Sequence, residues 1–132
     1  ILPWHDVVIG LIAGTVCYWA CIWLKHRLRY DDSLDVFGVH GVGGILGTLL
    51  AGVFATGAVS VSTDAPAGLN GLLYGNPGQL VTQAIGVAVT VAWCAAGTFI
   101  ALKVTAALTP LRVGKDEEVE GLDLALHGER LH

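Results

Sequence analysis

A long stretch without charged side chains runs from residue 36 to residue 63 and contains one histidine, His40. A helix of about 20 apolar residues crosses the hydrocarbon core of a bilayer, so this stretch is long enough to span a membrane. The composition agrees, with 54% hydrophobic and 14% charged residues and a mean hydropathy of +0.66. The stretch therefore predicts a transmembrane helix with His40 inside the bilayer.

Two further apolar runs flank this one. The first ends at a basic cluster, Lys25 to Arg29, and the last ends at Lys103. We therefore predict an all-α, polytopic membrane protein with transmembrane helices at about residues 5–25, 36–56 and 78–108. Residues 1–111 would form the transmembrane region, and residues 112–132 a hydrophilic tail.

The distribution of positive charge predicts the orientation of these helices. The basic cluster Lys25 to Arg29 is expected in a short loop, whereas the opposite loop, at about residues 56–79, contains no lysine or arginine. Loops rich in lysine and arginine stay on the cytoplasmic side. The N-terminus is therefore expected outside, and the C-terminal tail in the cytoplasm.

Several function classes are disfavoured by the composition. The three cysteines lack a metal-type spacing with histidines, and no nucleophile with a base, no phosphate loop and no basic nucleic-acid patch occurs in the sequence. We therefore expect no enzyme activity, no cofactor, no metal and no nucleic-acid partner. Because the chain begins Ile-Leu-Pro-Trp and contains no methionine, it is expected to be the C-terminal piece of a longer protein.

His40 is the candidate functional residue. An ionisable side chain at membrane depth tends to face a cavity or a partner helix. The bland alternative is a packing histidine that is hydrogen-bonded to a neighbouring helix. Small residues on its face would leave room for a narrow passage. On an α-helix, the predicted pore-lining or supporting positions that share the face of His40 are Val36, Phe37, Gly43, Gly44 and Gly47.

Three aspartates precede this helix. Asp35 is predicted to cap its N-terminus, because a carboxylate there accepts free backbone N–H groups. At a rise of 1.5 Å per residue, Asp35 lies only about 8 Å from His40 along the axis. Asp31, Asp32 and Asp35 are therefore expected in a water-filled cytoplasmic vestibule that cuts into the bilayer.

The order Asp-Asp-x-x-Asp-x-Phe-x-x-His-Gly-x-x-Gly, from Asp31 to Gly44, resembles the motif before and within the tenth transmembrane helix of ammonium transporters of the Amt/Rh/Mep family. The tail segments Gly121-Leu122-Asp123 and His127-Gly128-Glu129 are similar to the cytoplasmic C-terminus of bacterial members. The resemblance implies an 11-helix inverted-repeat fold, of which this chain would supply roughly helices 9 to 11 and the tail.

The resemblance also implies a function. It predicts a channel in the plasma membrane for ammonium or ammonia, and for methylammonium, in which His40 is the second of two histidines that relay a proton in a narrow apolar pore. It further implies a homotrimer in lipid, and a tail that includes Gly121 and Asp123 and regulates transport through a P-II-type signalling protein.

Two alternatives stay open. A protein of the same fold could be an ammonium sensor that signals through a partner, in which case the tail would continue into a signalling domain. An unrelated proton-coupled transporter would instead pair His40 with a carboxylate.

Overall fold

The computed structural model describes residues 1–32, 34–61, 63–64 and 66–121. Helices, turns and irregular segments make up these residues, and they contain no strand. Three helices among them are long and apolar enough to cross a membrane: Pro3–Leu28, Phe37–Phe54 and Pro77–Leu108. The prediction of an all-α membrane protein with three spanning helices is confirmed.

The first span consists of three helical segments without a break. They are α1 (Pro3–Trp19), a π-helix η1 (Ala20–Leu24) and α2 (Lys25–Leu28). Proline suits the first helical position, where its missing N–H is not needed, and Pro3 occupies it. At the other end Arg29 stops the helix in a left-handed conformation, with φ of 52°. The basic cluster predicted for the loop therefore lies mostly in the last helical turn, where positive charge favours the negative helix end.

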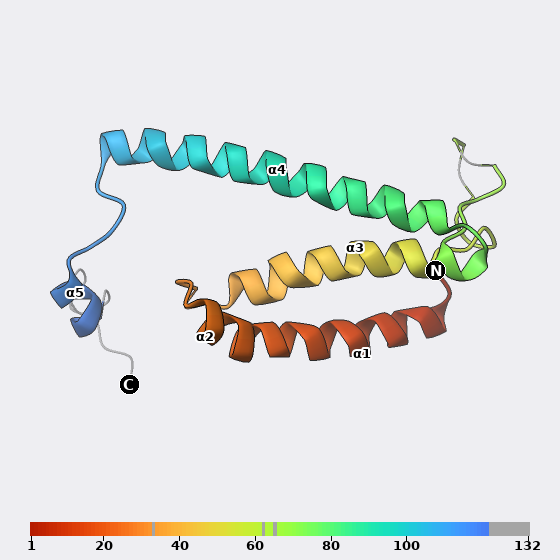
Figure 1. Cartoon of the computed structure of the whole chain (residues 1–132), viewed down its shortest axis with the longest axis horizontal. Coiled ribbons are helices and arrows are strands. Elements are labelled where there is room, and N and C mark those ends of the chain that lie inside the picture. The colour runs from red at the N-terminus through yellow and green to blue at the C-terminus, as the bar shows by residue number, and fades with distance from the viewer. Residues whose placement is uncertain (33, 62, 65, 122–132) are drawn as a thin grey trace. The chain divides into compact units, whose positions relative to one another are not determined.

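The second span begins with a π-helix, η2 (Phe37–Gly41), and continues as α3 (Val42–Phe54). It lies alongside the first span, with which both of its segments are in contact (Figure 1). Ala55 ends the helix by adopting an extended conformation. Glycine allows the two helices to approach closely, because Gly38 and Gly43 leave room for cysteine side chains of the first span.

A loop rich in turns joins the second span to the third and contains the short 3₁₀ helix η3 (Leu72–Tyr74). The N–H of Gly71 donates to the carbonyl of Ala55 at 2.8 Å. The N–H of Gly57 donates to the side chain of Asn70 at 2.6 Å. These bonds hold the two ends of the loop together over the end of α3.

The chain divides into two compact units, residues 1–90 and 91–132. The long helix α4 (Pro77–Leu108) begins in the first unit and ends in the second. Within the first unit, the Gln83 amide donates to the Thr48 carbonyl of α3 at 3.1 Å. The second unit also contains α5 (Lys115–Glu120).

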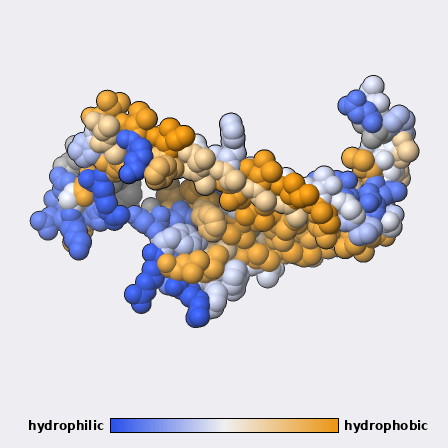
Figure 2. Space-filling view, turned by 45° about the horizontal axis from the view of Figure 1, so that its top comes forward, coloured by the Kyte–Doolittle hydropathy of each residue, from blue (hydrophilic) through white to orange (hydrophobic). Residues whose placement is uncertain are grey.

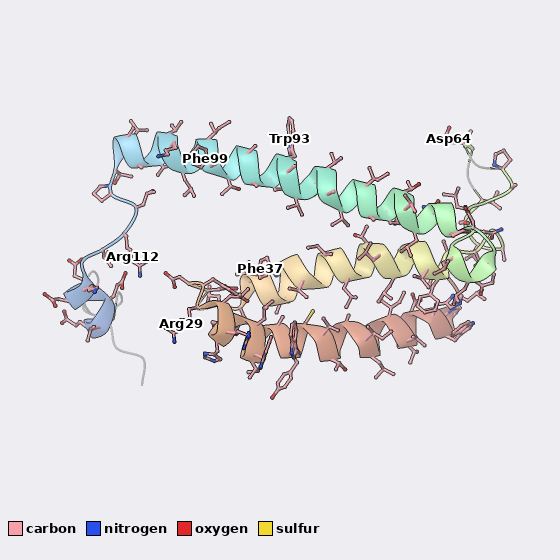
Figure 3. The ribbon with its side chains drawn as sticks, viewed as in Figure 1. Arg29, Phe37, Asp64, Trp93, Phe99 and Arg112 are labelled. Carbon is pink, nitrogen blue, oxygen red and sulfur yellow. The ribbon has the colours of Figure 1, made fainter. Side chains whose placement is uncertain are left out.

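Apolar side chains cover the helices on the face that Figure 2 shows, and hydrophilic residues gather near the helix ends. Trp93, which projects from α4 in Figure 3, is 80% exposed. No residue of α4 is buried within the chain. A helix that is apolar on all sides belongs in a large protein core or in a membrane, so this fold suits lipid and neighbouring helices.

Candidate functional site

His40 lies in the π-helix at the start of the second span. The N–H of Val42 closes this segment by donating to the carbonyl of Phe37, five residues earlier. Such segments are rare and occur often at functional sites. The His40 side chain is exposed, so the described residues leave it accessible to another helix or to a passage.

The glycines around His40 do not form a single stripe. A Cβ atom at Gly43 would lie 3.1 Å from the Cys17 sulfur of α1, so Gly43 faces the first span. At Gly44 and Gly47 nothing lies within 4 Å of such an atom. The α-helical spacing assumed for this face is wrong between Phe37 and Gly41, because the π-helix changes which residues lie above one another.

Val36 and Phe37 begin the same span, and both are about half exposed. The ring of Phe37 covers Gly41, where a Cβ atom would lie 2.8 Å from Cδ2 of the ring. Figure 3 shows Phe37 at the same end of the two spans as Arg29, which follows α2. Phe37 therefore lies at the end of the helix pair that carries the basic cluster.

The N-terminal cap of this span is Asp32. Its two carboxylate oxygens accept the N–H groups of Val36 and Phe37 at 2.9 and 2.8 Å. The prediction that Asp35 is the cap is wrong. Asp35 adopts a left-handed conformation with φ of 55°, and its carboxylate forms an ion pair with Lys25 at 2.7 Å. Sequence reasoning missed this partner, because Lys25 lies on the other span.

The three aspartates therefore differ in their surroundings. Asp31 is exposed, Asp32 is half-buried by its capping role and Asp35 is half-buried beside Lys25. The ion pair neutralises the charge of Asp35, and Arg27 and Arg29 lie at the same end of the helix pair as the aspartates.

Tyr30 completes this end of the helix pair. Its ring meets that of Phe37 edge-on, with centroids 5.4 Å apart. Burial, with a further contribution from Asp32, raises the pKa of Tyr30. Its hydroxyl oxygen is buried and has no hydrogen-bond partner among the described residues. The sequence pattern gave no signal for Tyr30, because its burial depends on packing between the two spans.

The predicted regulatory tail is described only as far as Gly121. This residue ends α5 with a positive φ of 98°, a conformation that glycine adopts without strain. Arg112 donates to the carboxylate of Glu118, and this hydrogen bond lowers the pKa of Glu118. Asp123 lies outside the described residues.

Metal binding has no basis in the described part of the chain, since no group of three or more His, Cys, Asp or Glu side chains there could hold an ion. What remains is a membrane helix pair with an exposed imidazole, a capped helix start and carboxylates at one end.

Several known proteins are similar to this chain in sequence. An ammonium transporter of Bacillus subtilis (strain 168) is 39% identical over the whole chain. A putative ammonium transporter of Methanothermobacter thermautotrophicus is 44% identical over 94% of the chain. An ammonium transporter of Aquifex aeolicus (strain VF5) is 44% identical over 96% of it. The chain spans only 31%, 30% and 28% of the lengths of these relatives.

The family model described as Ammonium Transporter Family matches residues 1–131, which include all three spans, His40 and the aspartates before it. The match therefore extends beyond the motif around His40 and covers the helix pair, α4 and the tail. This chain belongs to the ammonium transporter family.

Proposed function

We propose that this chain is the C-terminal part of an ammonium transporter, covering roughly helices 9 to 11 and the cytoplasmic tail. The whole protein would conduct ammonium or ammonia, and methylammonium, across the plasma membrane. The observation that carries the proposal is His40, an exposed imidazole on a membrane-length helix of a chain in this family.

In this proposal His40 is the second histidine of a proton relay. A neutral imidazole has one nitrogen that donates a hydrogen bond and one that accepts. It can therefore take a proton from ammonium and hand it on, while neutral ammonia moves along an apolar passage. Gly44 and Gly47 are compatible with this role, because neither carries a side chain and nothing in the described part of this chain lies within 4 Å of a Cβ atom placed there.

The aspartates would act at the cytoplasmic mouth of the passage. Exposed carboxylates raise the local concentration of cations, and Asp31 is exposed. Asp32 would hold the start of the helix in place through its two backbone hydrogen bonds. Asp35 would do the same through Lys25, so these two residues shape the mouth more than they attract substrate.

Assembly and regulation complete the proposal. The apolar outer faces of the spans fit a lipid-embedded homotrimer with one pore in each subunit. The tail, from residue 112 onward, would lie in the cytoplasm and bind a P-II-type signalling protein. Gly121, which ends α5 with a positive φ, would be the flexible point of this tail.

The decisive test replaces His40 with alanine in the full-length protein. Alanine removes the relay, so we expect ammonium-dependent current to be lost, while insertion survives because alanine is easier to place in lipid than imidazole. The ammonium-dependent current is measured on membranes in which the amount of inserted protein has been determined, so that wild type and variant are compared per molecule. Wild-type current in His40→Ala would contradict the relay and favour the packing role.

A second variant separates transport from sensing. Glutamate at position 40 can still exchange protons but adds a negative charge, so His40→Glu should keep some current and admit other monovalent cations. A protein that carries no ammonium current in its wild-type form, yet binds a signalling partner in an ammonium-dependent way, would be a sensor instead.

A further inference from the structure

Two π-helical segments lie against each other in the helix pair. They are η1 in the first span and η2 in the second, and they are in direct contact. In each segment the closing N–H reaches five residues back, from Lys25 to Ala20 and from Val42 to Phe37. Because η2 contains His40, its hydrogen-bond register decides where the imidazole points.

The two segments are in close contact at Gly38, which is buried. A Cβ atom at this position would lie 2.5 Å from the Cys21 sulfur and 3.3 Å from the Cys21 backbone nitrogen. A contact of 2.5 Å is far inside van der Waals separation. Any larger residue at position 38 would therefore force η2 away from η1 or displace the thiol.

A second thiol touches the backbone around His40 from the same side. The Cys17 thiol points to the carbonyl of Val39, the residue before His40, with sulfur and oxygen 3.9 Å apart. The same sulfur lies 3.1 Å from the place of a Cβ atom at Gly43. The two cysteines thus contact the second span both before and after His40.

The start of η2 is fixed as well. Lys25 follows η1 directly, and its Nζ lies 2.7 Å from Oδ1 of Asp35 in an ion pair. The carboxylate of Asp32 accepts the first N–H groups of the second span. Hydrogen bonds with a charged partner are about twice as strong as neutral ones. Sliding of η2 along η1 would break the Lys25–Asp35 pair, which joins the two spans, while the Asp32 bonds hold the start of η2 to the segment just before it.

We infer that Cys21 and Gly38 are positioning residues for His40: the thiol seated on the glycine holds η2 in its π-helical register. One residue corresponds to a rotation of about 100° on an α-helix. A π-helical turn holds about one residue more than an α-helical turn, so a return of η2 to α-helical geometry would turn His40 relative to α3. The inference rests on the proposed function only in taking His40 as the residue that meets the substrate.

The experiment uses the full-length protein and a rescue pair. Gly38→Ala adds a methyl group against the Cys21 sulfur, and we expect ammonium-dependent current to fall by about 10- to 100-fold, as small misplacements of a working group do. Cys21→Ala/Gly38→Ala removes that sulfur and should restore most of the current. Gly86→Ala is the matched control, because nothing lies within 4 Å of the added methyl group.

A second readout does not depend on transport. The ¹⁵N signals of the His40 ring, identified by their absence in His40→Ala, should shift in Gly38→Ala and return in the double variant. Signals and current that stay at wild-type values in Gly38→Ala would overturn the inference, as would a double variant that restores neither.

The remaining outcomes are also decisive. If the ring signals shift and return while His40→Ala carries normal current, the positioning role stands and the proposed relay fails. If Gly38→Ala does not reach the membrane, the single variant Cys21→Ala provides the test. Loss of the thiol should shift the ¹⁵N signals of the His40 ring, and unchanged signals would overturn the inference.

Discussion

His5 is the centre of an aromatic cluster at the start of α1, and it is fully buried. Its Nδ1 accepts the N–H of Leu2 at 2.8 Å, as a glutamate does in a capping box. Nε2 therefore carries the proton and donates to the hydroxyl of Tyr74, 3.0 Å away. The ring also packs against Trp4 and Phe54, with centroids 3.8 and 5.0 Å apart. A neutral histidine thus joins the first span, the second span and η3.

Replacing His5 with phenylalanine keeps the aromatic volume but leaves the Leu2 N–H and the Tyr74 hydroxyl without this partner. A buried polar group without a partner costs about 1–3 kcal/mol, so we expect a lower apparent melting temperature for His5→Phe in detergent. Tyr74→Phe removes only one of the two bonds and should have a smaller effect. Equal melting temperatures for wild type and His5→Phe would contradict the role of these bonds.

At the scale of the elements, the sequence predicts helices better than their hydrogen bonding. Apolar length alone indicated three membrane helices, since a span needs about 20 apolar residues, and the fold confirms them. It could not indicate that residues 37–41 bond in π-helical register, because that depends on the close contact of Gly38 with Cys21 across the helix pair. The choice of Asp32 rather than Asp35 as cap depends likewise on Lys25, a partner on another element.

The link between α5 and the segment before it should depend on pH. The hydrogen bond from Arg112 lowers the pKa of Glu118, so the stabilisation it gives is present above the ordinary glutamate pKa and is lost as pH falls through the lowered value. In Arg112→Gln, the titration midpoint of the Glu118 carboxyl carbon, followed by ¹³C NMR, should therefore rise. Lys115→Gln removes a positive charge from the same region and should leave the midpoint in place. An unchanged midpoint in Arg112→Gln would argue against the contact in solution.

At the scale of the whole molecule, the orientation predicted from lysine and arginine can be measured directly. A cysteine at Thr63 should react with an impermeant thiol reagent added outside intact cells, and a cysteine at Leu34 should not; both positions are exposed. The protein without either substitution gives the background reaction of its native cysteines. Labelling at Leu34 but not at Thr63 would reverse the orientation, and with it the cytoplasmic placement of the tail.

The length of α4 has a consequence for the membrane around it. A helix of 32 residues is about 48 Å long, whereas the hydrocarbon core is about 30 Å thick. Such a helix must tilt or extend into the headgroup region. Because α4 is longer than the hydrocarbon core is thick, it can adapt to a thinner or thicker bilayer by changing its tilt. Its ends can therefore stay at the interface as the lipid composition varies.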